Sequence, residues 1–332
     1  MNFDPTLIYR LKNVHCYAVT PFQTDNLFEI DFAGLARNLE FQIERGVQVI
    51  AVGGGTGEIG ALSESEIEQL VAAALQIVGD RALVVACVPG NLGQATRLLS
   101  KYQEMGVQVV LAMPPLVRGL VPTDLAGVFE YYRLLSDCTK IPLMPYNTQH
   151  WPAEFIVRLA DVEQMIAIKD PCFVPHEFFK AIKLLGDRFV WLGNKRHDPG
   201  IVQFRYQMGM QGFTSGQANF FPDHELAIHQ ASLKKDWDTI IALQKQAAPL
   251  EQLRSANDDA GMVKAGMDLV GLHGGSVRPP RCNISAKARL ELEEVIQDLA
   301  PGICQHKRKP NCVRHEGVNV GIMDASMISF WT

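Results

Sequence analysis

The sequence predicts an α/β fold, a (β/α)8 TIM barrel with a C-terminal helical extension. Short apolar runs rich in β-branched residues alternate with longer amphipathic segments over most of the 332-residue chain. These runs are continuously apolar, as is typical of strands buried on both faces of a parallel sheet. There are eight of them in the sequence, and eight is the number of strands that closes a barrel.

The candidate strands are separated by segments of helical periodicity. Two of these segments carry clear start signals: a capping box formed by Ser63 and Glu66, and the run Pro122-Thr123-Asp124. Repeated strand–helix units favour a parallel sheet. The alternative, an open doubly wound sheet, usually has fewer units. The strands are expected at residues 13–19, 48–53, 82–88, 107–113, 141–146, 165–169, 189–193 and 211–215.

Three parts are expected along the chain: a catalytic barrel over 1–230, a helical region over 231–302 and an irregular tail over 303–332. Strand signals stop after about residue 222. The apolar face of the first extra helix is expected to pack on the barrel or on a partner subunit. The tail lacks periodicity, which predicts poor order, with a subunit-contact arm as the alternative. Helices of the second part are expected around 232–254, 257–270 and 286–298.

Composition indicates a compact protein of the cytoplasm. Hydrophobic residues make up 47% and charged residues 20% of the chain, the balance of a globular domain. The net charge of −5 disfavours a nucleic-acid partner. Neither a secretory signal nor an apolar run of the ~20 residues that cross a membrane is recognisable. Seven cysteines without a CxxC pair indicate reduced thiols.

Two residues at neighbouring strand ends could carry chemistry, because active sites of barrels lie at the carboxyl ends of the strands. Lys169 ends an otherwise apolar strand, where desolvation would lower its pKa and leave a nucleophilic amine. Tyr146 ends the preceding strand and could relay protons. A lysine paired with Asp170 and a tyrosine with a satisfied hydroxyl are the purely structural alternatives.

The glycine-rich run GGGTGE, residues 53–58, follows the second strand and could hold a carboxylate through backbone N–H groups. Gly55, Gly57 and Gly60 also match the GxGxxG spacing of dinucleotide sites. That interpretation is disfavoured, since the helix signal comes only at Ser63 and no acidic residue ends the next strand.

Taken in order, GGGTGE, YN, AIKD and GMQGFTSGQAN resemble the signatures of the dihydrodipicolinate synthase / N-acetylneuraminate lyase superfamily, from about residue 13 to about 300. The resemblance implies an imine between Lys169 and a 2-keto acid, with Tyr146 as proton shuttle. It also implies catalysis without a metal or other cofactor, and a homotetramer built from dimers. Thr56 is implied as a catalytic residue, and substrate binding is implied for Gly54, Gly55, Thr56, Thr214, Ser215 and Gly216.

Three departures bear on the substrate. Dihydrodipicolinate synthases carry two adjacent threonines where this chain has Gly55 and Thr56, a tyrosine where it has Pro115 and Leu116, and an arginine where it offers Trp151. The motifs GGTGE, PPL and KD more closely resemble those of sugar-acid dehydratases such as the 5-dehydro-4-deoxyglucarate dehydratases. Aldol cleavage and dehydration both remain open, because they share one imine intermediate.

Other interpretations remain beside this one. They are dihydrodipicolinate synthase proper, a non-catalytic keto-acid-binding barrel, and a metal-dependent aldolase. The last is disfavoured, because His150, His176 and His197 are not spaced like metal ligands on one helix. A basic cluster follows the seventh strand. Lys195 or Arg196 of this cluster is expected to bind a distal group of the substrate, and a solvated loop is the alternative.

Overall fold

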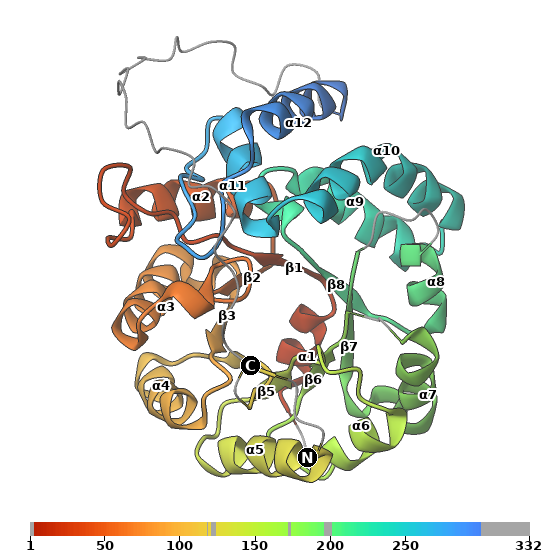
Figure 1. The fold of residues 1–332 in the computed structure, drawn as a ribbon. Coiled ribbons are helices and arrows are strands. Elements are labelled where there is room, and N and C mark those ends of the chain that lie inside the picture. Colours follow the sequence, from red (N-terminus) through yellow and green to blue (C-terminus); the bar gives the residue numbers. More distant parts are fainter. Residues whose placement is uncertain (1–2, 118, 121–123, 172–173, 196–200, 300–332) are drawn as a thin grey trace, which may run out of the picture.

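The computed structural model describes residues 3–117, 119–120, 124–171, 174–195 and 201–299. Eight parallel strands lie in the order β5-β4-β3-β2-β1-β8-β7-β6, and helices surround them (Figure 1). The predicted TIM barrel is confirmed. Seven of the expected strands contain an observed one, and the seventh strand runs one residue past its expected end at residue 193. The strands are β1 (Val14–Tyr17), β2 (Val49–Val52), β3 (Leu83–Val88), β4 (Val109–Ala112), β5 (Leu143–Pro145), β6 (Ala167–Lys169), β7 (Val190–Asn194) and β8 (Gly212–Ser215).

The helices follow the strands in alternation, with one before β1 and three after the last unit of the barrel. They are α1 (Pro5–Leu11), α2 (Phe32–Glu44), α3 (Glu64–Val78), α4 (Leu92–Met105), α5 (Leu125–Asp137), α6 (Ala153–Leu159), α7 (Pro175–Leu185), α8 (Ile201–Met208), α9 (Pro222–Leu233), α10 (Trp237–Ala256), α11 (Asp259–Leu269) and α12 (Ala286–Leu299). Short 3-10 helices are η1 (Ile59–Ala61), η2 (Gly79–Arg81), η3 (Gly186–Arg188) and η4 (Gln217–Asn219).

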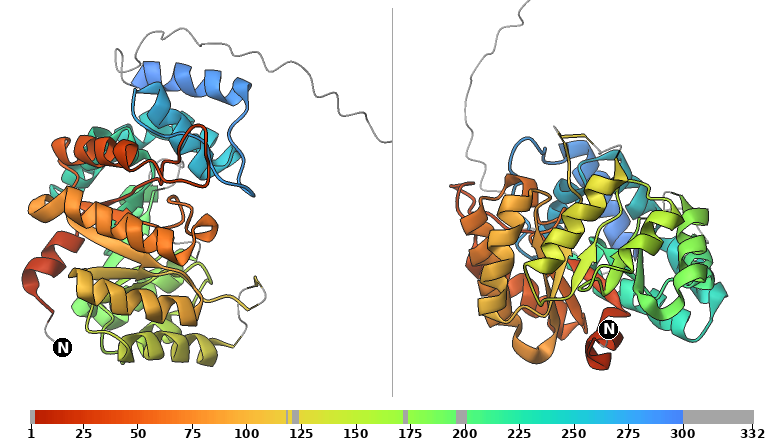
Figure 2. Two further views of the ribbon diagram at one scale, coloured as in Figure 1. Left: turned by 90° about the vertical axis from the view of Figure 1, so that its left-hand side faces the viewer. Right: turned by 90° about the horizontal axis from the view of Figure 1, so that it is seen from below.

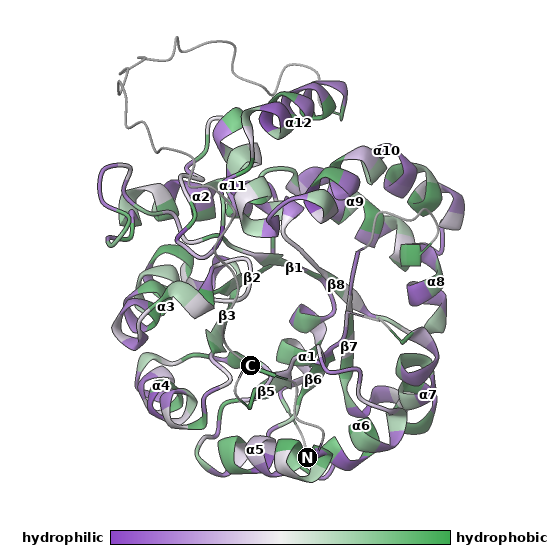
Figure 3. Ribbon diagram, in the orientation of Figure 1, coloured by the Kyte–Doolittle hydropathy of each residue, from purple (hydrophilic) through white to green (hydrophobic). Residues whose placement is uncertain are grey.

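Both predicted helix starts are present. Ser63 and Glu66 form a reciprocal capping box at the start of α3, and the Asp124 carboxylate accepts a hydrogen bond from the Ala126 N–H at the start of α5. Figure 3 shows apolar strands inside a ring of helices whose outer faces are more polar. The amphipathic periodicity therefore directs one face of each helix onto the sheet.

The barrel closes between β5 and β6. These two strands are joined by two isolated bridges, Leu143 with Met165 and Tyr146 with Lys169. The second bridge places the two candidate catalytic residues side by side at the carboxyl ends of their strands. The contact that closes the barrel is therefore also the contact that brings Tyr146 and Lys169 together.

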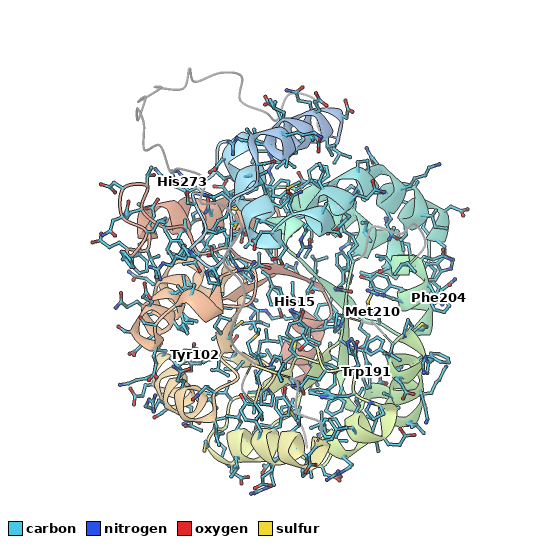
Figure 4. All side chains as sticks on the ribbon, viewed as in Figure 1. His15, Tyr102, Trp191, Phe204, Met210 and His273 are labelled. Atoms are coloured by element: carbon cyan, nitrogen blue, oxygen red, sulfur yellow. The ribbon has the colours of Figure 1, made fainter. Side chains whose placement is uncertain are left out.

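The barrel interior is a packed core closed at one end by α1. Leu11 is fully buried among inward-facing strand residues, and the partly buried Leu7 and Ile8 pack against the same cluster. The His15 ring lies inside the barrel (Figure 4), with Nε2 2.8 Å from the Leu11 carbonyl oxygen. In the left view of Figure 2, α1 projects from this end. The end at which the strands begin is thus filled by apolar side chains.

The helical extension begins with α10 and packs on the barrel as expected. Ile240 of α10 belongs to the cluster between the sheet and its helices, whereas Leu250 belongs to a separate core formed with α11 and α12. Helix α9 runs across residue 230, so the boundary expected there falls within a helix. The division into domains stays a prediction, and the expected tail 303–332 lies outside the described residues.

A buried ion pair joins the extension to the loop after β2. Lys264 Nζ of α11 lies 2.6 Å from Glu58 Oε1, and the Arg278 N–H donates to Glu58 Oε2 at 2.8 Å. Glu58 has a φ of 61°, a left-handed conformation that is unusual for a residue other than glycine. The last residue of GGGTGE therefore anchors the extension to the strand ends. Within the described residues, no helix has the length and apolarity needed to span a membrane.

Candidate functional site

Lys169 lies at the carboxyl end of β6, buried with a relative exposure of 6%. Its Nζ is 3.7 Å from the ring centroid of Tyr17 and 3.8 Å from that of Tyr146. Asp170, the suggested ion-pair partner, instead accepts a hydrogen bond from Asn147 Nδ2 at 2.6 Å. The amine is therefore held between two aromatic rings at the mouth of the barrel.

The YN pair at the end of β5 is fixed by the backbone. The Tyr146 N–H donates to the Ala112 carbonyl at 3.2 Å, and the Asn147 N–H donates to the Lys169 carbonyl at 2.8 Å. The Asn147 side chain also accepts from the Trp151 N–H at 3.0 Å. Asn147 thus ties the tyrosine strand to the lysine strand and orients both residues.

Burial is the main influence on the Lys169 amine, and it lowers the pKa of Lys169 from 10.5 to about 7. The second influence is the Cys87 thiol, which would raise the Lys169 pKa if it were ionised. Burial raises the pKa of Cys87 to about 12, so this thiol is uncharged near neutral pH. Arg254 lowers the Lys169 pKa further and Asp259 opposes it. Burial also raises the pKa of Tyr146. The pair therefore offers a neutral amine beside a protonated phenol.

Reductive labelling of Lys169 by pyruvate is expected to become faster as pH rises through about 7. Only the neutral amine attacks a carbonyl, so the lowered pKa of Lys169 makes protonation limiting below about pH 7 and not above about pH 8. An unperturbed lysine would leave ~10³-fold less neutral amine at pH 7. The measurement is the labelling rate with cyanoborohydride against pH, with exposed Lys183 as the internal control. A midpoint above about pH 9 at Lys169 would contradict the burial argument.

The glycine loop after β2 lies against the lysine pocket. A Cβ atom on Gly54 would come 3.0 Å from the Tyr17 ring and 3.3 Å from Cys87 Sγ, so this position has no room for a side chain. Gly55 has open space beside it, and Thr56 is buried. The loop therefore presents its backbone close to the Tyr17 ring, one of the two rings that enclose the Lys169 amine. The carboxylate-binding role of Gly54, Gly55 and Thr56 stays a prediction.

The end of β8 lies on a further side of the pocket, beside the Lys169–Tyr146 pair and the glycine loop. Thr214 is in register with His15 of β1 and Asn194 of β7. The Ser215 hydroxyl accepts a hydrogen bond from the Ala218 N–H at 3.2 Å, at the turn that follows the strand. A Cβ atom on Gly216 would lie 3.3 Å from Arg254 Nη2. The three predicted residues are thus brought to the same end of the barrel, and their substrate contacts stay predictions.

Four residues near the site were missed from the sequence. Tyr17 ends β1, two residues before the expected end of that strand, so its ring was not recognised as a strand-end group. Arg254, Asp259 and Arg281 come from the helical extension. Arg281 Nη1 lies 2.8 Å from Asp259 Oδ1, and its Nη2 donates to the Gly55 carbonyl at 3.2 Å. No local sequence pattern connects this extension with the barrel mouth.

The basic cluster after β7 is only partly described. Lys195 is buried and ion-paired with Glu225, with Nζ 3.1 Å from Glu251 Oε1 and 2.9 Å from Gln217 Oε1. These three partners occupy its ammonium group, so the expectation that Lys195 reaches the substrate is wrong. The hypothesis for Arg196 falls on a residue outside those described.

Comparison with known proteins agrees with this geometry. A model of the dihydrodipicolinate synthetase family matches residues 10–299. The 4-hydroxy-tetrahydrodipicolinate synthase of Methanosarcina mazei is 29% identical over 287 residues, covering 85% of this chain and 96% of that one. The probable 5-dehydro-4-deoxyglucarate dehydratase of Bacillus subtilis is 25% identical over 291 residues, covering 86% and 92%.

The fold is also similar to that of solved structures of this family. The crystal structure of dihydrodipicolinate synthase from Oceanobacillus iheyensis matches with a TM-score of 0.80 at 27% identity, covering 88% of this chain and 97% of that one. The match spans the barrel and most of the helical extension. The chain therefore belongs to the dihydrodipicolinate synthetase family, whose members are class I lyases that work through a lysine imine.

Proposed function

We propose that this enzyme dehydrates or cleaves a sugar-derived 2-keto acid held as an imine on Lys169. The observation that carries the proposal is the bridge between Tyr146 and Lys169, which closes the barrel with the amine 3.8 Å from the phenol ring centroid. The lowered pKa of Lys169 supports the same role. A lysine kept only for structure would gain from an acidic partner, whereas this one lies between two rings.

The chemistry begins with attack of the neutral Lys169 amine on the C2 carbonyl of the keto acid, with loss of water. The protonated imine withdraws electrons and acidifies the C3 hydrogens. Removal of a C3 proton gives an enamine, which expels a C4 hydroxyl as water. Alternatively, the C3–C4 bond breaks and releases an aldehyde, leaving the enamine of pyruvate. Water then hydrolyses the imine and restores the amine. Tyr146 carries the protons between these steps.

A sugar-acid substrate is favoured over aspartate semialdehyde by the side chains after β5. Trp151, at the position expected to hold the second substrate's carboxylate, is buried and packs against Tyr132 and Phe155. It also donates from Nε1 to Gln149 Oε1 at 3.1 Å. At this position after β5, therefore, the aspartate semialdehyde carboxylate would meet an apolar side chain and no cation.

Turnover of two substrate sets tests the proposal. We expect 5-dehydro-4-deoxyglucarate or a related 3-deoxy-2-keto sugar acid to be consumed, with the product identified by mass spectrometry. Pyruvate with aspartate semialdehyde should give at least ~10²-fold lower kcat/KM, since Trp151 replaces the cation expected after β5 for the semialdehyde's carboxylate. Comparable kcat/KM for both substrate sets would contradict this proposal and favour dihydrodipicolinate synthase activity. Binding of keto acids without any turnover would favour a sensing barrel.

We also propose a cytoplasmic homotetramer, a dimer of dimers. A tetramer of this kind needs two different self-complementary surfaces, and we assign them to two of the apolar patches on the described residues. One is a groove lined by Phe179 and Phe204 on α7 and α8, where Phe204 points outward (Figure 4). The other is formed by Leu116, Val117 and Leu120 after β4, each more than half exposed. Free thiols at Cys16 and Cys87 fit a reducing compartment.

Replacing Phe204 with aspartate is expected to convert tetramers into dimers, because a charge cannot be buried without a partner in an apolar contact. Light scattering at micromolar concentration measures the mass against the 36.8 kDa chain. Leu290→Asp, on α12 outside both patches, is the matched control because Leu290 is exposed to a comparable degree. A wild-type chain that is monomeric at all concentrations would refute the proposed assembly.

A further inference from the structure

A chain of charged residues crosses the barrel mouth from β7 to the glycine loop. It starts at Lys195, whose partner Glu251 lies 4.0 Å from Arg254, measured from Oε2 to Nη1. Arg254 Nη2 is in turn 3.6 Å from Asp259 Oδ2. Asp259 is bound by Arg281, which reaches the Gly55 carbonyl. The catalytic scheme above uses none of these groups.

Among these charged residues, Arg254 is the one whose N–H donors are not used. Glu251 is already paired with Lys195 at 3.1 Å, and Asp259 with Arg281 at 2.8 Å. Both acids lie beyond 3.5 Å from the Arg254 nitrogens. Within the described parts of the chain, its guanidinium therefore donates no hydrogen bond, although such a group carries five N–H donors. With 23% of the side chain exposed, these donors can reach a ligand.

The position of Arg254 is beside the reacting groups. Its Nη2 lies 3.3 Å from where a Cβ of Gly216 would stand, at the end of β8. Its charge acts on both Lys169 and Tyr146, lowering the pKa of each. The negative charge of Asp258 is offset at the start of α11, where its carboxylate caps the helix by accepting from the Gly261 N–H. The guanidinium thus borders the pocket from the side of the extension.

We propose that Arg254 binds the far end of the substrate, so that the site selects 2-keto acids carrying a second carboxylate. The planar fork of a guanidinium matches a carboxylate with two parallel hydrogen bonds. An arginine with unused donors beside the imine-forming lysine is suited to this task. The inference rests on the proposed function, because it needs the keto end of the substrate to be bound at Lys169.

Borohydride trapping of matched keto acids provides the test and requires no turnover. The probes are pyruvate, the pair 2-oxopentanoate and 2-oxoglutarate, and the pair 2-oxohexanoate and 2-oxoadipate. Within each pair the chain length is equal and only one acid has a terminal carboxylate. Intact mass, with the label mapped to Lys169, gives the concentration that half-saturates trapping. The wild-type enzyme is expected to require about 10- to 100-fold less of at least one diacid than of its partner.

Arg254→Gln should reduce that preference to within about 3-fold. Because loss of the Arg254 charge also raises the pKa of Lys169, pyruvate trapping is measured in the same variant, and the change for each acid is expressed relative to the change for pyruvate. Arg254→Lys, which keeps the charge but not the fork, should retain part of the preference. Arg289→Met is the control, because Arg289 lies on α12 at 3.9 Å from Asp268 and belongs to another ion pair. A thermal melt checks that each variant is folded. If Arg254→Gln is unfolded, the diacid preference is tested with Arg254→Lys instead.

Two results would overturn the inference: no diacid preference in the wild-type enzyme, or an equal loss of trapping for both members of a pair in the glutamine variant. A third result has a different meaning. If pyruvate itself fails to label Lys169 of the wild-type enzyme, the proposed imine chemistry fails, whatever Arg254 does.

Discussion

Replacing Lys169 with alanine is expected to abolish both turnover and labelling by pyruvate and borohydride. The loss should exceed the ~10²- to 10⁴-fold that removal of a general acid–base group typically causes, because the covalent route itself disappears. The protein should stay folded, since the substitution removes a desolvated amine that, among the described residues, lies against two rings and makes no ion pair. The measurements are kcat/KM on the best substrate of the screen and intact mass after reduction.

The control for this prediction is Lys183→Ala, on the exposed face of α7, which should retain full labelling and turnover. Labelling that survives in the Lys169→Ala enzyme at one defined lysine would mean that another amine forms the imine. The buried Lys264 is the first residue to map in that case, although its ion pair with Glu58 argues against it. Turnover that survives without labelling would contradict the class of mechanism.

Replacing Tyr146 with phenylalanine is expected to lower kcat by about 10²- to 10⁴-fold while labelling by pyruvate persists. The ring that contacts Lys169 remains and only the hydroxyl is lost, so the amine stays in place. Proton transfers to and from the bound intermediate then lack their carrier. Steady-state kinetics gives kcat, and reduction with borohydride at matched saturation gives the amount of imine.

Tyr17→Phe is the matched control, because the Tyr17 ring, on β1, lies at a nearly equal distance from Lys169 Nζ. The Tyr17 hydroxyl is buried and has no hydrogen-bond partner among the described residues. Its removal should therefore cost less than about 10-fold in kcat and should not destabilise the protein. A Tyr17→Phe enzyme as impaired as Tyr146→Phe would mean that the phenol of β1 carries the protons.

The sequence predicts the barrel and its catalytic pair because both depend on local patterns. Continuous apolar runs identify the strands, and a lysine or tyrosine at the end of such a run stands out against its neighbours. Helix α1 has only seven residues, too few for a periodic pattern, so it was not predicted. Its Asp4 cap and Pro5 start are local signals that could have indicated it.

The rest of the site depends on contacts between parts of the chain that are distant in sequence. Arg254 and Asp259 lie at the junction of α10 and α11 and reach the barrel mouth only because these helices fold back across it. The same holds for Lys195, which looked like an exposed cation in the sequence. Its buried acidic partners come from α9 and α10, so no inspection of the loop alone would have found them.

The apolar closure of the barrel by α1 has a kinetic consequence. Because Leu11 and its described neighbours fill the end where the strands begin, we expect reactant and product to use the opposite end, where Lys169 lies. The product released last leaves behind the free enzyme that the keto acid binds, so that product should inhibit competitively. Flux through the enzyme would then depend on how quickly the following metabolic step removes what this one releases.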